Sequence, residues 1–89
     1  MNSVRIDYCS KCRWLLRAAW LAQEVMGTFE EEVSEVRLRK AEAGTFDIYL
    51  NDALLWSRKR EGRFPEIKEL KQAIRDRVSP ERDLGHVDR

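Results

Sequence analysis

Apolar and polar residues along the chain follow two periods, one typical of β-strands and the other of α-helices. Residues 3–8 alternate apolar with polar side chains, as a half-buried strand does. From 13 to about 28 the apolar residues recur three or four positions apart, which predicts a helix with a wide apolar face against a sheet. Gly27 and Thr28 mark its end. The side chains expected on its buried face are Leu15, Ala19, Ala22, Met26 and Phe29, flanked by Trp14, Ala18, Leu21 and Val25.

The second half of the chain predicts three further strands. Strand-like alternation returns over residues 33–41. Two more apolar runs, 45–50 and 53–57, are separated by the turn-forming pair Asn51-Asp52. Two strands joined by two turn residues are typical of a β-hairpin.

A second helix and a charged segment complete the chain. Pro65 suits the first turn of a helix, whose apolar stripe is Ile67, Leu70, Ile74 and Val78. The order is then β-α-β-β-β-α, an α/β fold with a four-stranded mixed sheet and two helices, because the first helix implies a parallel crossover. We expect one domain over residues 1–80 and a charged flexible tail over 81–89.

Length and charge narrow the function classes. The 89 residues suffice for one domain with a modest core. With 17 Lys+Arg against 16 Asp+Glu, the formal charge of +1 lacks the basic excess usual in nucleic-acid binders. No apolar run approaches the roughly 20 residues of a membrane span, and no secretory signal is visible. We therefore expect a cytoplasmic monomer or weak dimer that binds neither nucleic acid nor membranes.

The two cysteines, Cys9 and Cys12, carry the strongest chemical signal. Cys9 is expected where the first strand ends and Cys12 about one turn into the following helix, within reach of a disulfide. Unpaired N–H groups at a helix N-terminus favour a thiolate, and Lys11 and Arg13 add positive charge. Asp7 either opposes this effect or accepts a proton. The pattern is typical of thiol–disulfide exchange, with metal binding and inert thiols as the alternatives.

The sequence has too few ligands for the cysteines to form a closed metal site. A closed zinc site takes about four ligands. The chain offers two cysteines and one histidine, His86, which lies in the expected tail. Only a dimer sharing two cysteine pairs could complete such a site, so we expect no metal.

The predicted order is that of a minimal thioredoxin-like fold, and its motifs resemble those of selenoprotein W and its relatives, the selenoprotein T/W/H group or Rdx family. The cysteine motif is Tyr8-Cys9-Ser10-Lys11-Cys12. Residues 44–59 resemble the family's Gly-x-Phe hairpin with its Ser-basic-basic ending, and Phe64-Pro65 the opening of its final helix. The resemblance covers about residues 3–78. It implies a thiol redox role with a thiol or disulfide protein partner, often linked to glutathione as a co-substrate.

Two arguments disagree about which sulfur attacks a partner. The expected geometry favours Cys9, at the start of the helix and more exposed, with Cys12 as the resolving thiol. The resemblance favours Cys12, which stands where some family members carry selenocysteine. From the residues we predict Cys9. The chain also has Ala43-Gly44 where thioredoxin places a cis-proline, which argues against thioredoxin-like docking of substrates.

The tryptophans and the basic run after the hairpin suggest a second surface. Trp14 is expected to pack in or over the core. Trp56 alternates with Leu55, so one of them should face away from the core, and Trp56 with Arg58 and Lys59 forms a candidate partner surface. The basic residues also fit a solvated strand end. The alternative function is a non-enzymatic interaction module whose binding through the hairpin is tuned by the thiols.

Overall fold

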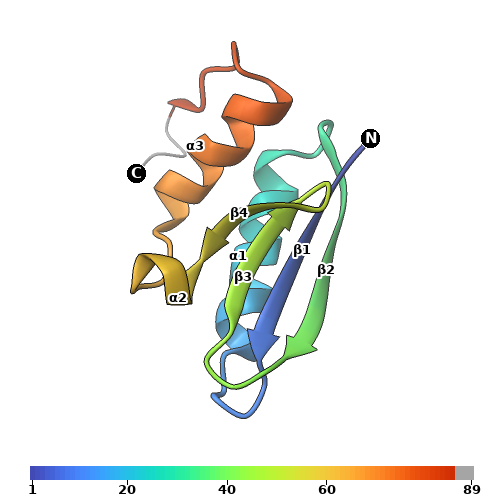
Figure 1. The fold of residues 1–89 in the computed structure, drawn as a ribbon. Coiled ribbons are helices and arrows are strands. Elements are labelled where there is room, and N and C mark those ends of the chain that lie inside the picture. Colours follow the sequence, from blue (N-terminus) through green and yellow to red (C-terminus); the bar gives the residue numbers. More distant parts are fainter. Residues whose placement is uncertain (86–89) are drawn as a thin grey trace.

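Four strands form one mixed sheet in the computed structural model, which describes residues 1–85 (Figure 1). They are β1 (Asn2–Cys9), β2 (Val33–Ala41), β3 (Phe46–Leu50) and β4 (Ala53–Ser57), in the spatial order β2-β1-β3-β4. β1 pairs in parallel with β2 and antiparallel with β3, which pairs antiparallel with β4. The predicted strands and the mixed sheet are confirmed, and β1 lies between two neighbours.

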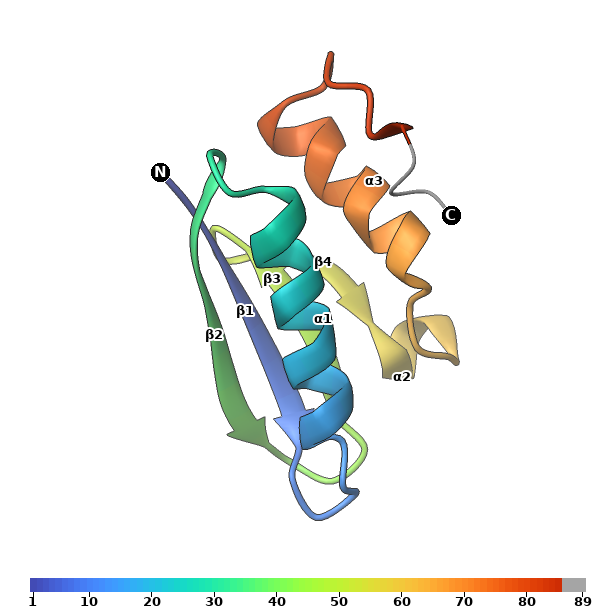
Figure 2. The same ribbon diagram turned by 180° about the vertical axis from the view of Figure 1, so that it is seen from behind.

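Two long helices lie side by side on one face of this sheet (Figure 2). They are α1 (Leu15–Thr28), which connects β1 to β2, and α3 (Ile67–Val78). A single-turn helix, α2 (Arg58–Glu61), was not predicted and replaces the expected strand end. It forms because the hydroxyl of its N-cap, Ser57, accepts a hydrogen bond from the backbone N–H of Arg60. Otherwise the predicted order of elements is confirmed. No helix within residues 1–85 is long and apolar enough to cross a membrane.

The core lies between the sheet and the two long helices, but α1 turns a different side to it than predicted. Leu15 and Met26, expected on the buried face, are 48% and 38% exposed. The α1 residues that are buried were expected only as flanks: Ala18, Leu21 and Val25. Because apolar residues occur on nearly every side of α1, periodicity alone does not specify which side faces the sheet.

The segment after α3 packs against the domain. Arg82 pairs with Glu32, 3.0 Å away, and Leu84 is only 6% exposed. One apolar side chain within this charged segment therefore anchors the first part of what was expected to be a tail over 81–89. The rest of that segment, including His86, lies outside the described residues.

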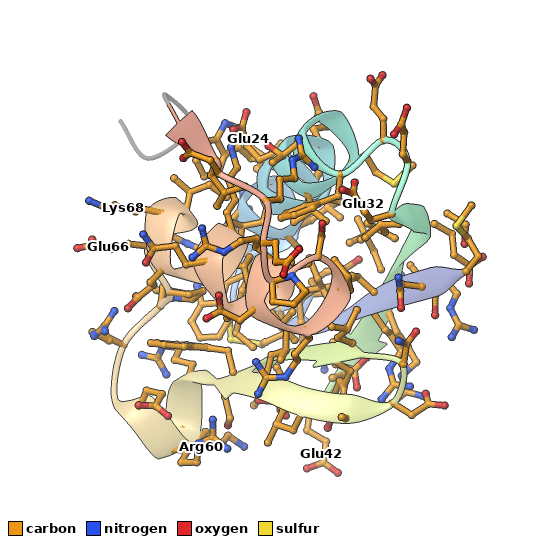
Figure 3. The ribbon with its side chains drawn as sticks, turned by 90° about the horizontal axis from the view of Figure 1, so that it is seen from above. Glu24, Glu32, Glu42, Arg60, Glu66 and Lys68 are labelled. Carbon is orange, nitrogen blue, oxygen red and sulfur yellow. A yellow bond between two sulfur atoms is a disulfide. The ribbon has the colours of Figure 1, made fainter. Side chains whose placement is uncertain are left out.

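α3 begins at a capping box that carries an ion pair. Glu66 is the N-cap, and its N–H donates to the Glu69 carboxylate at 2.7 Å (Glu66 is labelled in Figure 3). Glu69 also pairs with Arg63. The hydrogen bond from Arg63 holds the pKa of Glu69 below its ordinary value. Because Glu66 is the N-cap, Pro65 precedes the helix, and the prediction that it lies in the first turn is wrong.

Replacing Glu69 by Gln should flatten the acid side of the stability profile. Glutamine keeps an acceptor for the N–H of Glu66 but removes the charge that pairs with Arg63. Because the folded-state pKa is depressed, the stabilisation is complete above the unfolded pKa of about 4.3 and is lost as pH falls through the folded value. Chemical denaturation between about pH 3 and pH 7 should show a gap between wild type and Glu69→Gln that closes in acid. A gap independent of pH contradicts the prediction.

Candidate functional site

The cysteine pair spans the loop between β1 and α1. Cys9 is the last residue of β1, and its N–H donates to the carbonyl oxygen of Thr45 at 2.8 Å. A disulfide joins Cys9 to Cys12, and their Cα atoms lie 5.3 Å apart, a separation typical of such bonds. Within residues 1–85, no three or more His, Cys, Asp or Glu side chains gather to hold a metal ion.

This loop is a turn and not the first turn of the helix, which corrects the prediction for Cys12. The N–H of Arg13 donates to the carbonyl oxygen of Ser10 at 3.1 Å, and Arg13 has a positive φ of 63°. A left-handed residue cannot continue a right-handed helix, so α1 begins only at Leu15. The Cys9 sulfur accepts a hydrogen bond from the N–H of Cys12 at 3.1 Å. The N–H donor to sulfur that was expected from the first turn of the helix therefore comes from this turn instead.

The two cysteines differ in exposure, in the opposite sense to the prediction. Cys9, the last residue of β1, is only 1% exposed. Cys12 is half-buried, and the exposed cations Lys11 and Arg13 flank it in sequence. A partner can therefore reach the pair through Cys12.

A cavity of about 240 Å³ opens beside the pair. Its walls come from the cysteine loop and from the connection between β2 and β3: Cys9, Ser10, Lys11, Ala41, Glu42 and Ala43. Parallel pairing of Cys9 with Ala41 brings the two loops together. Local sequence patterns do not show that Ala41 and Glu42 lie beside the cysteines, because they do not contain the register of strands that are distant in the sequence. Glu42 points outward at this rim (Figure 3).

Trp14 anchors the far end of the cysteine loop in an aromatic cluster with Phe46 and Phe64. Its ring packs edge-on against both, with centroids 6.3 Å and 4.9 Å away, respectively. The Arg58 guanidinium lies 4.8 Å from the centroid of the Trp14 ring. The prediction that Trp14 packs against the core is confirmed.

Trp56 does not face away from the core. A register shift in the pairing of β3 with β4 allows both Leu55 and Trp56 to pack against the core. The indole N–H of Trp56 donates to the carbonyl oxygen of Arg63 at 3.1 Å, and the Arg63 guanidinium lies 4.8 Å from its ring centroid. The strict alternation assumed from the sequence is broken by this bulge, so Trp56 is not an open surface.

The basic residues after the hairpin lie near the cysteine loop. Arg58 stacks on Trp14, the residue that follows Arg13. Lys59 is exposed, and its Cε lies 3.4 Å from the point that a Cβ on Gly44 would occupy. Gly44 follows the cavity wall directly. Arg58 and Lys59 therefore lie on the side of the molecule that holds the cysteines, and they do not form a common surface with Trp56.

The buried carboxylate closest in sequence to the pair is already ion-paired. Asp7 is 4% exposed and accepts a hydrogen bond from Arg5 at 3.0 Å and two from Arg39 at 3.1 and 2.7 Å. The hydrogen bond to Asp7 raises the pKa of the Arg39 guanidinium. Arginine side chains therefore engage both carboxylate oxygens of Asp7, which disfavours its predicted role as a proton acceptor.

Comparison with known proteins finds relatives over nearly the whole chain. The Rdx family matches residues 3–76. The crystal structure of a selenoprotein W-related protein from Vibrio cholerae is 46% identical with a TM-score of 0.85, over 88% of this chain and 98% of that one. A Bordetella parapertussis protein of known structure is 49% identical with a TM-score of 0.82, over 84% and 95% of the two chains. No curated protein matches in sequence.

Replacing Asp7 by Asn should destabilise the protein by about 2 kcal/mol, because it removes charged hydrogen bonds at a buried position. Asp52→Asn is the matched control, since Asp52 is 84% exposed and contacts Arg5 only at 3.4 Å. It should change the free energy of unfolding by less than about 0.5 kcal/mol. Urea denaturation of both variants measures the difference, and equal effects would refute the structural role of Asp7.

Proposed function

This chain belongs to the Rdx family, and we propose that it is a thiol–disulfide oxidoreductase in which Cys12 attacks the partner and Cys9 resolves the intermediate. The unequal exposure of the two cysteines carries this assignment. Cys9 is 1% exposed, whereas Cys12 is half-buried in the same turn. This assignment of the attacking sulfur to Cys12 replaces our prediction from the sequence that Cys9 attacks. The assignment agrees with the resemblance to selenoprotein W, because Cys12 of this chain stands where some family members carry selenocysteine.

The proposed reaction transfers two electrons from the protein to a partner disulfide. The Cys12 thiolate attacks one partner sulfur, forms a mixed disulfide and releases the other sulfur as a thiolate. Cys9 then loses its proton and attacks the Cys12 sulfur, which forms the Cys9–Cys12 disulfide and releases the second partner thiolate. The partner is thereby reduced to two thiols and the protein dithiol is oxidised. The same steps in reverse oxidise a partner dithiol.

Local charge and hydrogen bonding support these separate roles. Lys11 and Arg13 flank Cys12, and the sequence has no Asp or Glu from residue 8 to residue 23. Positive charge beside a thiol stabilises its thiolate, so Lys11 and Arg13 favour the Cys12 thiolate. The N–H of Cys12, 3.1 Å from the Cys9 sulfur, stabilises negative charge on Cys9 when it attacks or leaves.

Glutathione is the small co-substrate that we propose beside a thiol or disulfide protein partner. The cavity of about 240 Å³ that Cys9, Ser10 and Lys11 line can accept part of such a molecule next to the disulfide. Lys11 in its wall is a cation for a glutathione carboxylate, and Glu42 is an anion for its amino group. Work in the reducing cytoplasm fits a pair that cycles between dithiol and disulfide.

The alternative of a non-enzymatic interaction module through the hairpin receives less support. Its central residue, Trp56, packs against the core and beneath the Arg63 guanidinium. Arg58 stacks on Trp14. Only Lys59 of that proposed surface is exposed.

A redox titration tests the proposed function directly. The protein is equilibrated in glutathione or dithiothreitol buffers, and free thiols are trapped and counted by mass. We expect one reversible two-electron transition of the Cys9–Cys12 pair between roughly −350 and −150 mV. A pair that stays fully oxidised or fully reduced across this window would refute the redox role.

The single serine variants test which sulfur attacks. Cys12 in Cys9→Ser should react with iodoacetamide about tenfold faster near pH 7 than Cys9 in Cys12→Ser, because the Cys12 sulfur is the more accessible of the two and its thiolate is stabilised by nearby positive charge. Adding Lys11→Gln to Cys9→Ser should slow the alkylation of Cys12, because it removes a neighbouring positive charge. Adding Lys68→Gln, which removes an exposed cation on α3 (Figure 3), should leave Cys12 unchanged. Faster alkylation of Cys9 would reverse the two roles.

A further inference from the structure

α1 is apolar on its outward side as well as on its buried side. Leu16 is 83% exposed and Trp20 is 49% exposed. These two residues share a helical stripe with three others, and together they define the outer face of α1: Leu16, Ala19, Trp20, Gln23 and Gly27. None of the five is charged, and no other element of residues 1–85 covers this side of the helix (Figure 2). An uncharged, uncovered helix face of this length is typical of an interaction surface.

Opposite charges stand at the two ends of this face. The exposed cations Lys11 and Arg13 precede α1, and the exposed carboxylates Glu30 and Glu31 follow it. None of these four residues forms an ion pair within residues 1–85, although nine such pairs occur there. The outer face is therefore an apolar strip with a basic end and an acidic end.

Nothing within residues 1–85 accounts for a glycine at position 27. It lies in the last turn of α1, it is exposed, and its φ is not positive. A Cβ at this position would meet nothing within 4 Å. Glycine weakens a helix relative to alanine, so neither backbone conformation nor internal packing favours it here. A second helix crossing the outer face would benefit, because the missing side chain allows close approach.

We propose that the outer face binds a second copy of this chain, with the two α1 helices antiparallel about a two-fold axis that crosses the outer face between Trp20 and Gln23. About this point Arg13 stands opposite Glu30 of the second copy, and Leu16 opposite its Gly27. Each contact occurs twice, as two-fold symmetry requires. α1 has 14 residues and is about 21 Å long, so one helix face supports a weak dimer.

The charge pattern favours a second copy over other partners. An anionic membrane would be repelled by Glu30 and Glu31 at one end of the face. An acidic protein segment would match Lys11 and Arg13 but not the other end. Both charged ends are paired only by a partner that places an acidic group opposite the basic end and a basic group opposite the acidic end. An antiparallel second copy has this charge arrangement. The inference does not depend on the redox activity of the cysteines.

Analytical ultracentrifugation of the full chain under reducing conditions tests the proposal. We expect a reversible monomer–dimer equilibrium with a dissociation constant in the micromolar range. Leu16→Asp should raise this constant at least tenfold. The matched control is Leu54→Asp, because Leu54 is another exposed leucine, 38% exposed, but lies on β4. It should leave dimerisation unchanged.

Gly27→Ala separates dimerisation from folding. Alanine favours the helix and fits the open space, so the melting temperature of the monomer should rise by a few degrees. The same methyl group should raise the dissociation constant of the dimer several-fold. A variant that is more stable and dimerises as well as wild type would show that Gly27 is not at an interface.

A charge reversal tests the antiparallel arrangement. Arg13→Glu should weaken the dimer, and so should Glu30→Arg. The double variant should dimerise again nearly as well as wild type, because each reversed pair is restored across the two-fold axis. A monomer at every concentration, or a dimer insensitive to Leu16→Asp, would overturn the proposal. Binding of the monomer to phosphatidylserine vesicles through Leu16 and Trp20 would replace it with a membrane surface.

Discussion

The position of Cys9 at the end of the central strand determines the geometry of the rest of the site. β1 is paired on both sides, and its last residue donates its N–H to Thr45 and is shielded from solvent. The chain must leave the sheet at once, and it does so through a turn in which Arg13 is left-handed. This turn places Cys12 outside the sheet but still close enough to Cys9 for a disulfide. One sulfur is thus internal and the other accessible.

Both ends of the cysteine loop are fixed by interactions that do not involve sulfur. The strand pairing of β1 holds the first end, and the Trp14–Phe46–Phe64 cluster holds the second. Asp7, on the strand that ends at Cys9, is held by hydrogen bonds from its arginine partners. A loop anchored in this way can make and break the disulfide with little change in the surrounding fold, as repeated thiol–disulfide exchange requires.

Local patterns predicted the order of elements, the strand limits and the cysteine pair, because these depend on period and spacing. They did not predict features that depend on tertiary packing. The left-handed Arg13 delays the helix, and Cys9 at the end of β1 is the buried cysteine. A bulge turns Trp56 inward. Because apolar residues occur on nearly every side of α1, the sequence did not show which side faces the sheet, and the outward exposure of Leu16 was not predicted.

We propose that the Cys12 sulfur forms the mixed disulfide with a partner, and an intermediate trapped in the unmodified protein shows directly which sulfur does so. Fully reduced protein is mixed with glutathione disulfide, quenched with acid at the earliest times, digested at low pH and mapped by mass spectrometry. If Cys12 attacks, the transient glutathione adduct is on Cys12 and decays into the Cys9–Cys12 disulfide. A transient adduct on Cys9 with the same decay would show that Cys9 is the attacking sulfur.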